Sequence, residues 1–171
     1  MPTSAAFALT AGDPAAALIS LLHGYDDLDW TRVRAALADE VVVDYTSVFG
    51  GRVETLGADA LVRRWRAVLP GFDATQHITG PVLVSAEPGD ATMHLEAQAR
   101  AHHLMRGDPT SSSWLIAGRY QLAVTPTVAG GWLITELTLH CFYEEGDRGL
   151  LALARSRAGT DPRPGRPARP A

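Results

Sequence analysis

The chain of 171 residues contains no lysine and no asparagine, so all 15 of its basic residues are arginine. The absence of lysine excludes Schiff-base chemistry and any other catalysis by a side-chain amine. A single cysteine, Cys141, excludes an intramolecular disulfide and a cysteine-based zinc site. One free thiol is also typical of a protein from a reducing compartment.

Long apolar runs and an excess of positive charge are missing as well. No run of 18 apolar residues predicts a transmembrane helix. Residues 1–13 carry neither the basic start nor the apolar length of a secretory signal. The formal net charge of −4 argues against a general nucleic-acid binder, which needs a basic face. We therefore expect a cytoplasmic protein that contacts neither membrane nor nucleic acid.

What is present indicates one globular domain. Hydrophobic residues make up 46% of the chain and charged residues 20%, which is ordinary for a chain that buries a full core. We expect a flexible arm over residues 1–12, the domain over 13–147 and a short helical segment over 148–158. Residues 159–171 are rich in proline and arginine and predict a disordered tail. That tail is either simply solvated or an arm for an anionic partner.

The first third of the chain predicts helices around one strand. Asp13-Pro14 is a favourable helix start, and the apolar stripe that follows ends at Tyr25, with Asp26 beside it. Asp29 predicts the cap of a second helix. A β-branched run predicts a strand over residues 41–47 that includes Tyr45, and a third helix is expected from about 58 to 69.

From residue 74 onwards the hydrophobic period changes to two. We expect four strands, at about 74–86, 91–106, 113–126 and 132–143, separated by turns rich in glycine and proline. Helices followed by an antiparallel meander are typical of the α+β class. A curved sheet wrapped around those helices would leave a cone-shaped pocket.

Alternation along the strands predicts which side chains face that pocket. His103 falls on the apolar face of its strand with several alanines, among them Ala99, which leave room for a ligand unless helix side chains fill it. The next strand presents Trp114, Ile116, Gly118 and Tyr120 on one face. Gly118 either marks a bulge or makes space for a close neighbour.

The remaining titratable residues show no strong motif. His77 alone is more typical of a surface or hydrogen-bonded histidine than of a catalyst. His102 and His103 are neighbours on a strand and point to opposite faces, so they cannot easily share one metal ion. No phosphate-binding glycine loop, dinucleotide fingerprint or GxSxG elbow occurs. We therefore expect no metal and no cofactor.

Several short motifs, in order, resemble scytalone dehydratase and the SnoaL-like branch of the NTF2-like superfamily. They are Tyr25-Asp26-x-x-Asp29-Trp30, Asp44-Tyr45-x-Ser47, Thr75-Gln76-His77 and Gln98-x-Arg100-x-x-His103. The resemblance spans roughly residues 15–145. It implies an NTF2-like (cystatin-like) cone in which helices pack into a strongly curved mixed sheet around a deep pocket. It also implies one site per subunit, a small-molecule substrate and a homo-oligomer, either a dimer or a trimer.

The resemblance assigns roles to five residues. Tyr25 and Tyr45 would hold a water molecule or polarise a substrate carbonyl, Asp26 would orient His103 and raise its pKa, and His77 would be the second acid–base group. The substrate wall is expected at Ile116, Gly118, Tyr120, Trp65 and Ala99. The family has a serine and an asparagine where this chain has approximately Ile116 and Gly118. That departure favours a bulkier or more apolar substrate than scytalone.

These residues predict a cofactor-independent lyase, most simply a dehydratase that acts on a hydroxylated cyclic or polyketide-like molecule through an enolate. The same acid–base set could run a cyclisation or an isomerisation. A hypothesis of another class is a non-catalytic binding or assembly protein, in which these polar groups merely line a ligand pocket.

Overall fold

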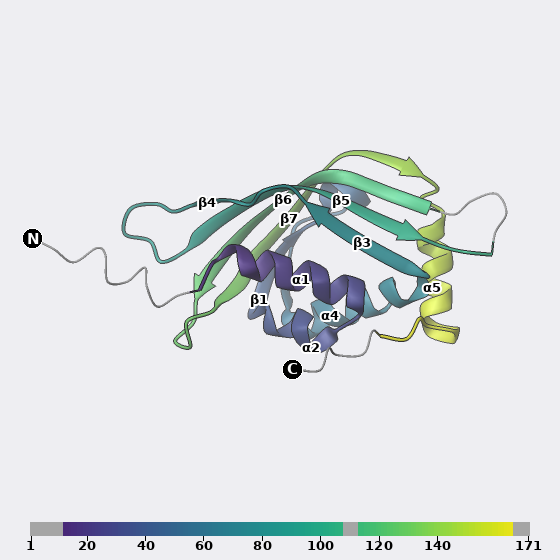
Figure 1. Cartoon of the computed structure of the whole chain (residues 1–171), viewed down its shortest axis with the longest axis horizontal. Helices are drawn as coiled ribbons and strands as arrows, with labels where there is room; N and C mark the ends of the chain where they lie inside the picture. Colours follow the sequence, from purple (N-terminus) through teal and green to yellow (C-terminus); the bar gives the residue numbers. More distant parts are fainter. Residues whose placement is uncertain (1–11, 108–112, 166–171) are drawn as a thin grey trace, which may run out of the picture.

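A strongly curved mixed sheet with helices on its inner side forms the fold in the computed structural model, which describes residues 12–107 and 113–165 (Figure 1). The first half of the chain forms α1 (Ala15–Asp27), α2 (Trp30–Ala35), β1 (Leu37–Asp44), α3 (Thr46–Phe49), β2 (Glu54–Gly57), α4 (Ala58–Arg66) and the short 3-10 helix η1 (Leu69–Gly71). The second half forms β3 (Ala74–Thr79), β4 (Leu83–Ser85), β5 (Met93–Leu104), β6 (Ser113–Pro126), β7 (Trp132–Gly146) and α5 (Leu150–Thr160).

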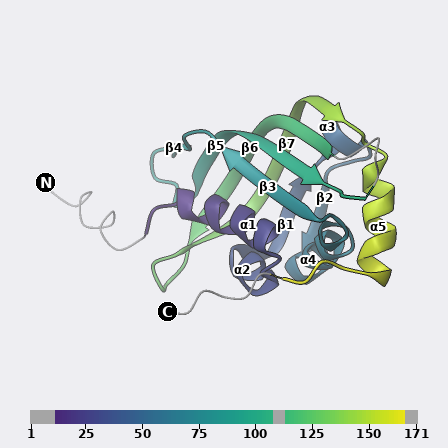
Figure 2. The same ribbon diagram turned by 45° about the vertical axis from the view of Figure 1, so that its right-hand side comes forward.

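The sheet is open, with strand order β2-β1-β7-β6-β5-β3, and β4 pairs with β5 beyond β3. Among the strands of the described residues, only the β1–β7 pairing is parallel. Helix α1 runs beneath the curved sheet, and α5 packs against η1 at the opposite end from β4 (Figure 2). This architecture confirms the predicted α+β class and the NTF2-like cone.

Helix α1 is the element around which the sheet closes, because its apolar stripe is almost completely inaccessible. Leu18, Leu21 and Leu22 are each at most 1% exposed, and Tyr25 continues the stripe at 3%. The helix ends at Leu28, whose φ of 55° lets the backbone reverse into α2. Gly24 allows α2 to pack closely, since a Cβ there would lie 2.6 Å from a methyl carbon of Val33.

The strand predicted over residues 41–47 is displaced towards the N-terminus. β1 ends at Asp44, whose Oδ1 accepts hydrogen bonds from the backbone N–H of Thr46 at 2.9 Å and from its hydroxyl at 2.7 Å. These contacts start α3 and place Tyr45 at its N-cap instead of in a strand. The prediction also missed β2, a four-residue edge strand that is too short for a periodic signal.

The later strands match their predicted positions with small changes. Gly80-Pro81 divides the strand expected over 74–86 into β3 and β4. Helix α5 continues to Thr160, past the boundary expected at 158. Beyond it Arg163 donates its backbone N–H to Pro70 O at 2.6 Å, so the tail predicted to be disordered from 159 is placed against η1 as far as the structure describes it. Residues 1–11 of the expected arm and 166–171 of the tail lie outside the described residues.

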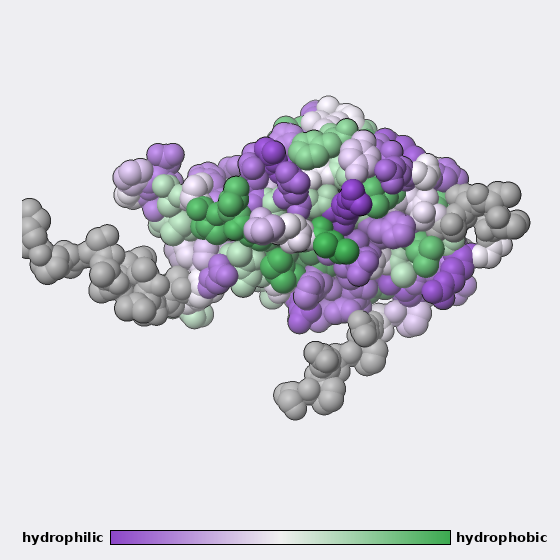
Figure 3. All heavy atoms as spheres, turned by 45° about the horizontal axis from the view of Figure 1, so that its top comes forward, coloured by the Kyte–Doolittle hydropathy of each residue, from purple (hydrophilic) through white to green (hydrophobic). Residues whose placement is uncertain are grey.

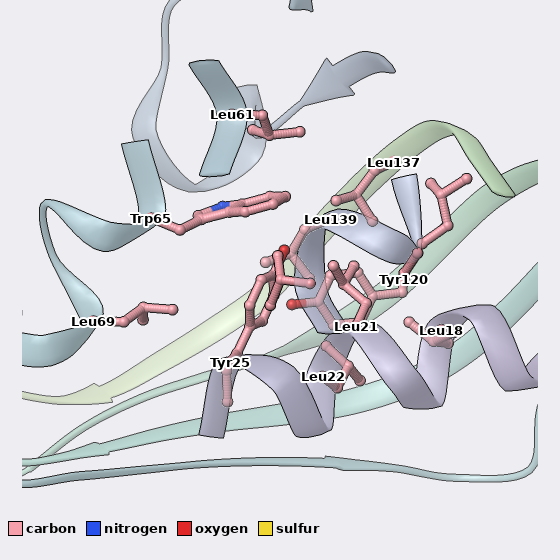
Figure 4. Packing of buried hydrophobic residues seen from close by; sticks show 14 of the residues in the cluster. Leu18, Leu21, Leu22, Tyr25, Leu61, Trp65, Leu69, Tyr120, Leu137 and Leu139 are labelled. Atoms are coloured by element: carbon pink, nitrogen blue, oxygen red, sulfur yellow. The ribbon is translucent and has the colours of Figure 1, made fainter. Parts of the chain in front are cut away.

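The core lies between α1, α2, α4 and the inner face of the sheet (Figure 4). On the outer side, apolar side chains interrupt a largely hydrophilic surface (Figure 3). Ile78, Leu83 and Val84 of β3 and β4 are among the exposed large apolar residues. In the described part of the chain, no helix combines the length and the apolar character that crossing a membrane requires.

Candidate active site

A cavity of about 350 Å³ opens between α1, α3, α4, α5 and the inner face of the sheet. Its volume lies in the range of small-molecule sites. The inner lining is mainly apolar and aromatic, with a few polar atoms. It is formed by Tyr25, Val43, Tyr45, Trp65, Val68, Leu69, Phe72, His77, Ala101, His103, Trp114, Ile116, Tyr120 and Leu139.

Asp26 and His77 form a hydrogen-bonded pair at one wall of this cavity. The His77 ring nitrogen Nδ1 lies 2.7 Å from Asp26 Oδ1, and the backbone N–H of His77 donates to Oδ2 at 2.7 Å. A carboxylate only accepts hydrogen bonds, so Nδ1 carries the proton. In the tautomer that carries its proton on Nδ1, the His77 ring keeps Nε2 free, on a side chain that lines the cavity and is 6% exposed.

The Asp26 carboxylate is held in its ionised form. Burial alone would raise its pKa, but the hydrogen bonds from His77 and the charge of that ring outweigh burial and leave the pKa below its usual value. Asp26 lies behind His77 and does not line the cavity itself. The pair has the arrangement of a general base whose tautomer is fixed by a carboxylate.

The predicted partnership of Asp26 with His103 is wrong. β3 runs antiparallel to β5 in a register that places Thr75 opposite His103 and His77 opposite Ala101. β3 lies at the edge of the sheet. Asp26, at the end of α1, contacts His77 of this strand with both of its carboxylate oxygens. The carboxylate therefore orients His77, and the expected upward shift of the His103 pKa does not occur.

His103 is a neutral, buried histidine. It is 5% exposed, stacks on Trp114 with ring centroids 4.9 Å apart, and also contacts Phe72 at 4.8 Å. Burial, helped by the charge of nearby His77, lowers its pKa to about 3. Its Nδ1 lies 3.3 Å from Trp114 O and carries the proton because a carbonyl can only accept. Nε2 is thus a hydrogen-bond acceptor. The centroids of the His103 and His77 rings lie 5.8 Å apart.

The low pKa of His103 predicts a pH dependence of folding stability. The unfolded chain binds a proton at this residue below about pH 6.5, whereas the folded protein does not bind one until about pH 3. Stability is therefore complete above pH 6.5 and falls as the pH drops towards 3. Between pH 7.5 and pH 5 this residue should account for a loss of about 2 kcal/mol.

Urea unfolding of the wild type and of His103→Gln at both pH values checks this expectation, because glutamine cannot titrate. The wild type should lose about 2 kcal/mol more than the variant over this interval. Exposed His94 supplies the matched control, and His94→Gln should behave like the wild type. Parallel losses in the wild type and in His103→Gln would contradict the expectation.

Three tyrosines place hydroxyl groups at the cavity. Figure 4 shows Tyr25 on α1 and Tyr120 on β6 turned towards the same space, next to Trp65. Burial raises the pKa of Tyr45 to about 12 and the pKa of Tyr25 and Tyr120 well above the usual value. All three are therefore protonated donors near neutral pH. Tyr25 Oη is buried and has no partner in good hydrogen-bond geometry among the described residues, and its nearest interacting polar group is the hydroxyl of Tyr45.

Of the residues predicted for the substrate wall, Trp65, Ile116 and Tyr120 line the cavity, whereas Ala99 and Gly118 do not. β5 contributes His103 and Ala101 to the cavity lining, but Ala99, the next inward-facing residue along the strand, does not reach the cavity. Gly118 faces the neighbouring strand, where a Cβ would lie 2.1 Å from His140 O. The pairing of β6 with β7 shifts register at this point because Phe142 of β7 is unpaired. A β-bulge and the close approach of the β7 backbone together explain why a glycine stands at position 118.

Sequence reasoning did not single out several wall residues. Phe72 and Leu69 come from the turn after α4, where no periodic pattern exists. Trp114 was placed on the same strand face as Ile116 but was not included in the predicted substrate wall. Within residues 12–107 and 113–165, no three side chains of the metal-ligating types gather into a possible ion site.

The back of Asp26 borders a second, larger cavity of about 740 Å³. Polar residues dominate this space, and Arg163 from the end of the described chain reaches it. The Nη2 of Arg163 lies 3.4 Å from Thr75 Oγ1. Of these two cavities, the first is lined by His77 and His103 and has mainly apolar walls, whereas the second is lined by Asp26 but by neither of those histidines.

Comparisons with known proteins agree with this geometry. The family model described as a SnoaL-like domain matches residues 16–138. No curated protein matches the chain. Among solved structures, the Kfla4162 protein from Kribbella flavida is 23% identical and superposes with a TM-score of 0.70, covering 83% of this chain and 97% of the other.

Two further structures carry descriptions of chemistry. A candidate scytalone dehydratase from Novosphingobium aromaticivorans is 15% identical with a TM-score of 0.66, covering 78% of this chain and 85% of the other. The hexachlorocyclohexane dehydrochlorinase LinA-type3 from Novosphingobium barchaimii is 19% identical with a TM-score of 0.58, covering 79% of this chain and 90% of the other. At these identities the likeness establishes a shared fold.

Proposed function

The chain belongs to the SnoaL-like domain family, and on that premise we propose that it is a cofactor-independent acid–base lyase, most simply a dehydratase. Its substrate would be a hydroxylated cyclic or polyketide-like molecule. The observation that carries this proposal is the Asp26–His77 pair, which presents a free imidazole nitrogen to an apolar cavity containing tyrosine hydroxyls. Structures of the same fold described as a scytalone dehydratase candidate and a dehydrochlorinase support elimination as the reaction type.

The reaction uses His77 twice. Nε2 removes a proton from the carbon next to a substrate carbonyl, and the electron pair moves onto the carbonyl oxygen to form an enolate. The enolate then re-forms the carbonyl as the C–O bond of the β-hydroxyl breaks, and that oxygen leaves as water with the proton that His77 had taken. Asp26 stabilises the imidazolium that exists between the two transfers.

The other polar groups hold the substrate in this scheme. The hydroxyls of Tyr25, Tyr45 and Tyr120 are donors for the developing enolate oxygen, a contribution typically worth a few kcal/mol per donor. Neutral His103 cannot supply a proton near neutral pH because its Nδ1–H is held by Trp114 O. Its role would be to accept a hydrogen bond from a substrate hydroxyl, which corrects the acid–base role expected from the sequence.

Cyclisation and isomerisation start from the same enolate and differ only in what the enolate does next. Incubation with a panel of cyclic β-hydroxy ketones, followed by mass spectrometry, separates these outcomes. A dehydratase lowers the substrate mass by about 18 units, the mass of the water expelled. An unchanged mass at a new retention time indicates a cyclase or an isomerase. Ligand binding without conversion across the panel would favour the non-catalytic alternative.

The hydroxyl of Tyr25, which is buried without a partner in good hydrogen-bond geometry, gives a prediction in which stability and activity move in opposite directions. A buried donor without a partner costs free energy, so Tyr25→Phe should leave the free energy of unfolding unchanged or raise it by up to about 1 kcal/mol. Loss of the donor should lower turnover by about 10- to 100-fold. Thermal unfolding and initial rates measure the two effects.

Tyr143 provides the control, because it is exposed and its hydroxyl accepts a hydrogen bond from Arg100. Tyr143→Phe should change stability by less than about 0.5 kcal/mol and leave turnover as it is. A Tyr25→Phe variant that is markedly less stable would show that the hydroxyl has a structural partner.

A further inference from the structure

The cavity changes character from its floor to its mouth. The inner walls are apolar or carry neutral polar groups, whereas the mouth is formed by exposed or half-exposed residues of the α3–β2 loop, α4 and α5. Four of these mouth residues are charged, and three of the four are cations: Arg52, Glu54, Arg64 and Arg155. The chain as a whole carries a formal charge of −4, so this positive mouth is not part of a generally basic surface.

The four charged residues are not equally available to a ligand. Arg64 is committed to Glu54, with hydrogen bonds of 2.7 and 3.3 Å to its two carboxylate oxygens. Arg52 makes no hydrogen bond or ion pair within the described residues, but its charge acts on the same glutamate and helps to lower the Glu54 pKa. Arg155, one helical turn beyond the cavity residue Leu151, makes no hydrogen bond or ion pair with any other residue in the part of the chain that the structure describes.

Arg155 is thus a free guanidinium at the rim of an apolar cavity. The single acidic residue of the rim is already paired, so the mouth keeps a net positive charge and an unused pair of parallel N–H donors. A guanidinium binds a carboxylate through two such donors, and this geometry is more demanding than attraction between point charges. The arrangement suits a molecule with a ring for the interior and an anionic end for the rim.

We propose that the ligand of this cavity is an amphipathic carboxylate, whose ring system lies against Trp65, Trp114 and Ile116 while its carboxylate binds Arg155 at the mouth. This inference rests on the proposed function only in taking the cavity as the substrate site. It narrows the substrate class from hydroxylated cyclic molecules to those that carry a carboxylate remote from the reacting carbon. Figure 2 shows α5, which carries Arg155, across the end of the fold.

A pair of probes that differ only in charge tests the proposal. Isothermal titration with 2-naphthoate and with 2-naphthamide compares the same ring with and without the carboxylate. The wild type should bind the naphthoate about tenfold more tightly, and raising the NaCl concentration from about 0.05 M to about 0.5 M should reduce that preference. Arg155→Gln should abolish the preference without weakening the amide, and Arg155→Lys should retain part of it.

Arg63 on the exposed side of α4 is the matched control, since it does not line the cavity. Arg63→Gln should bind both probes as the wild type does. Equal affinity for the two probes, an equal loss of both in Arg155→Gln, or no binding of either up to about 5 mM overturns the proposal.

The binding result does not depend on catalysis. If the charge preference depends on Arg155 while His77 variants keep full turnover, the proposed reaction fails and the ligand class stands. If His77 proves essential and the preference is absent, the reaction stands and the ligand class fails.

Discussion

Replacing His77 by glutamine should lower turnover by at least about 10³-fold while leaving the fold intact. Glutamine can keep a hydrogen bond to Asp26 at the position where Nδ1 of His77 lies 2.7 Å from the carboxylate, but it offers no basic nitrogen to the cavity. Initial rates on the substrate identified by mass spectrometry, together with thermal unfolding, measure the effect. The unfolding temperature should change by only a few degrees.

Asp26 and His77 should behave as one unit. Asp26→Asn removes the negative charge and the acceptor that fixes the tautomer, so we expect a loss of about 10²- to 10³-fold. The double variant Asp26→Asn/His77→Gln should be no worse than His77→Gln alone, because the carboxylate acts only through the imidazole. His94→Gln, on the exposed face of β5, is the control and should keep full activity. Wild-type turnover in His77→Gln would remove the basis of the proposed mechanism.

Adding one methyl group at Gly118 should destabilise the protein by about 3 kcal/mol or more. The Cβ of Gly118→Ala would lie 2.1 Å from His140 O and 3.0 Å from His140 C, both of them backbone atoms of β7. Neither strand can move aside, because β6 and β7 pair along almost their whole length in the middle of the sheet. Urea unfolding should show a large decrease in midpoint.

Gly80→Ala is the control that separates steric crowding from the loss of a glycine's backbone freedom. A Cβ at this position would have its nearest neighbour, Gln98 O, at 3.9 Å, which is an ordinary contact. Gly80→Ala should therefore change stability by less than about 1 kcal/mol. Similar losses in the two variants would show that backbone freedom, and not the closeness of β7, explains Gly118.

Which side chains line the cavity could be predicted from the sequence in part, but the pairing of Asp26 could not. Tyr25 and His103 line the cavity as periodicity predicts, since helical and strand periods determine which face a residue occupies, whereas His77 was expected there only from the family resemblance. Asp26 was expected beside His103 and lies beside His77. Periodicity gives no information on which strand the end of α1 reaches, because strand order and register are set by long-range contacts.

Other errors arise where a local hydrogen bond outweighs a pattern. The β-branched run up to Ser47 favours a strand, yet the Asp44 carboxylate caps Thr46 and turns the chain into α3. The Ser47 hydroxyl then donates to Leu139 O at 2.6 Å, a contact across 92 residues that no sequence window could contain. The charged mouth of the cavity was missed because Arg52, Arg64 and Arg155 come from three segments that are far apart in the sequence.

The parallel pairing of β1 with β7 also determines when the site can form during synthesis. β1 is complete by residue 44, but its neighbour on one side, β7, begins only at Trp132. Until β7 leaves the ribosome, a strand rich in valine keeps an unpaired edge, which is a template for aggregation. Leu139 and Arg155 of the cavity arrive later still. Nascent chains should therefore depend on chaperones over most of their length, and refolding should be slow for a protein of this size.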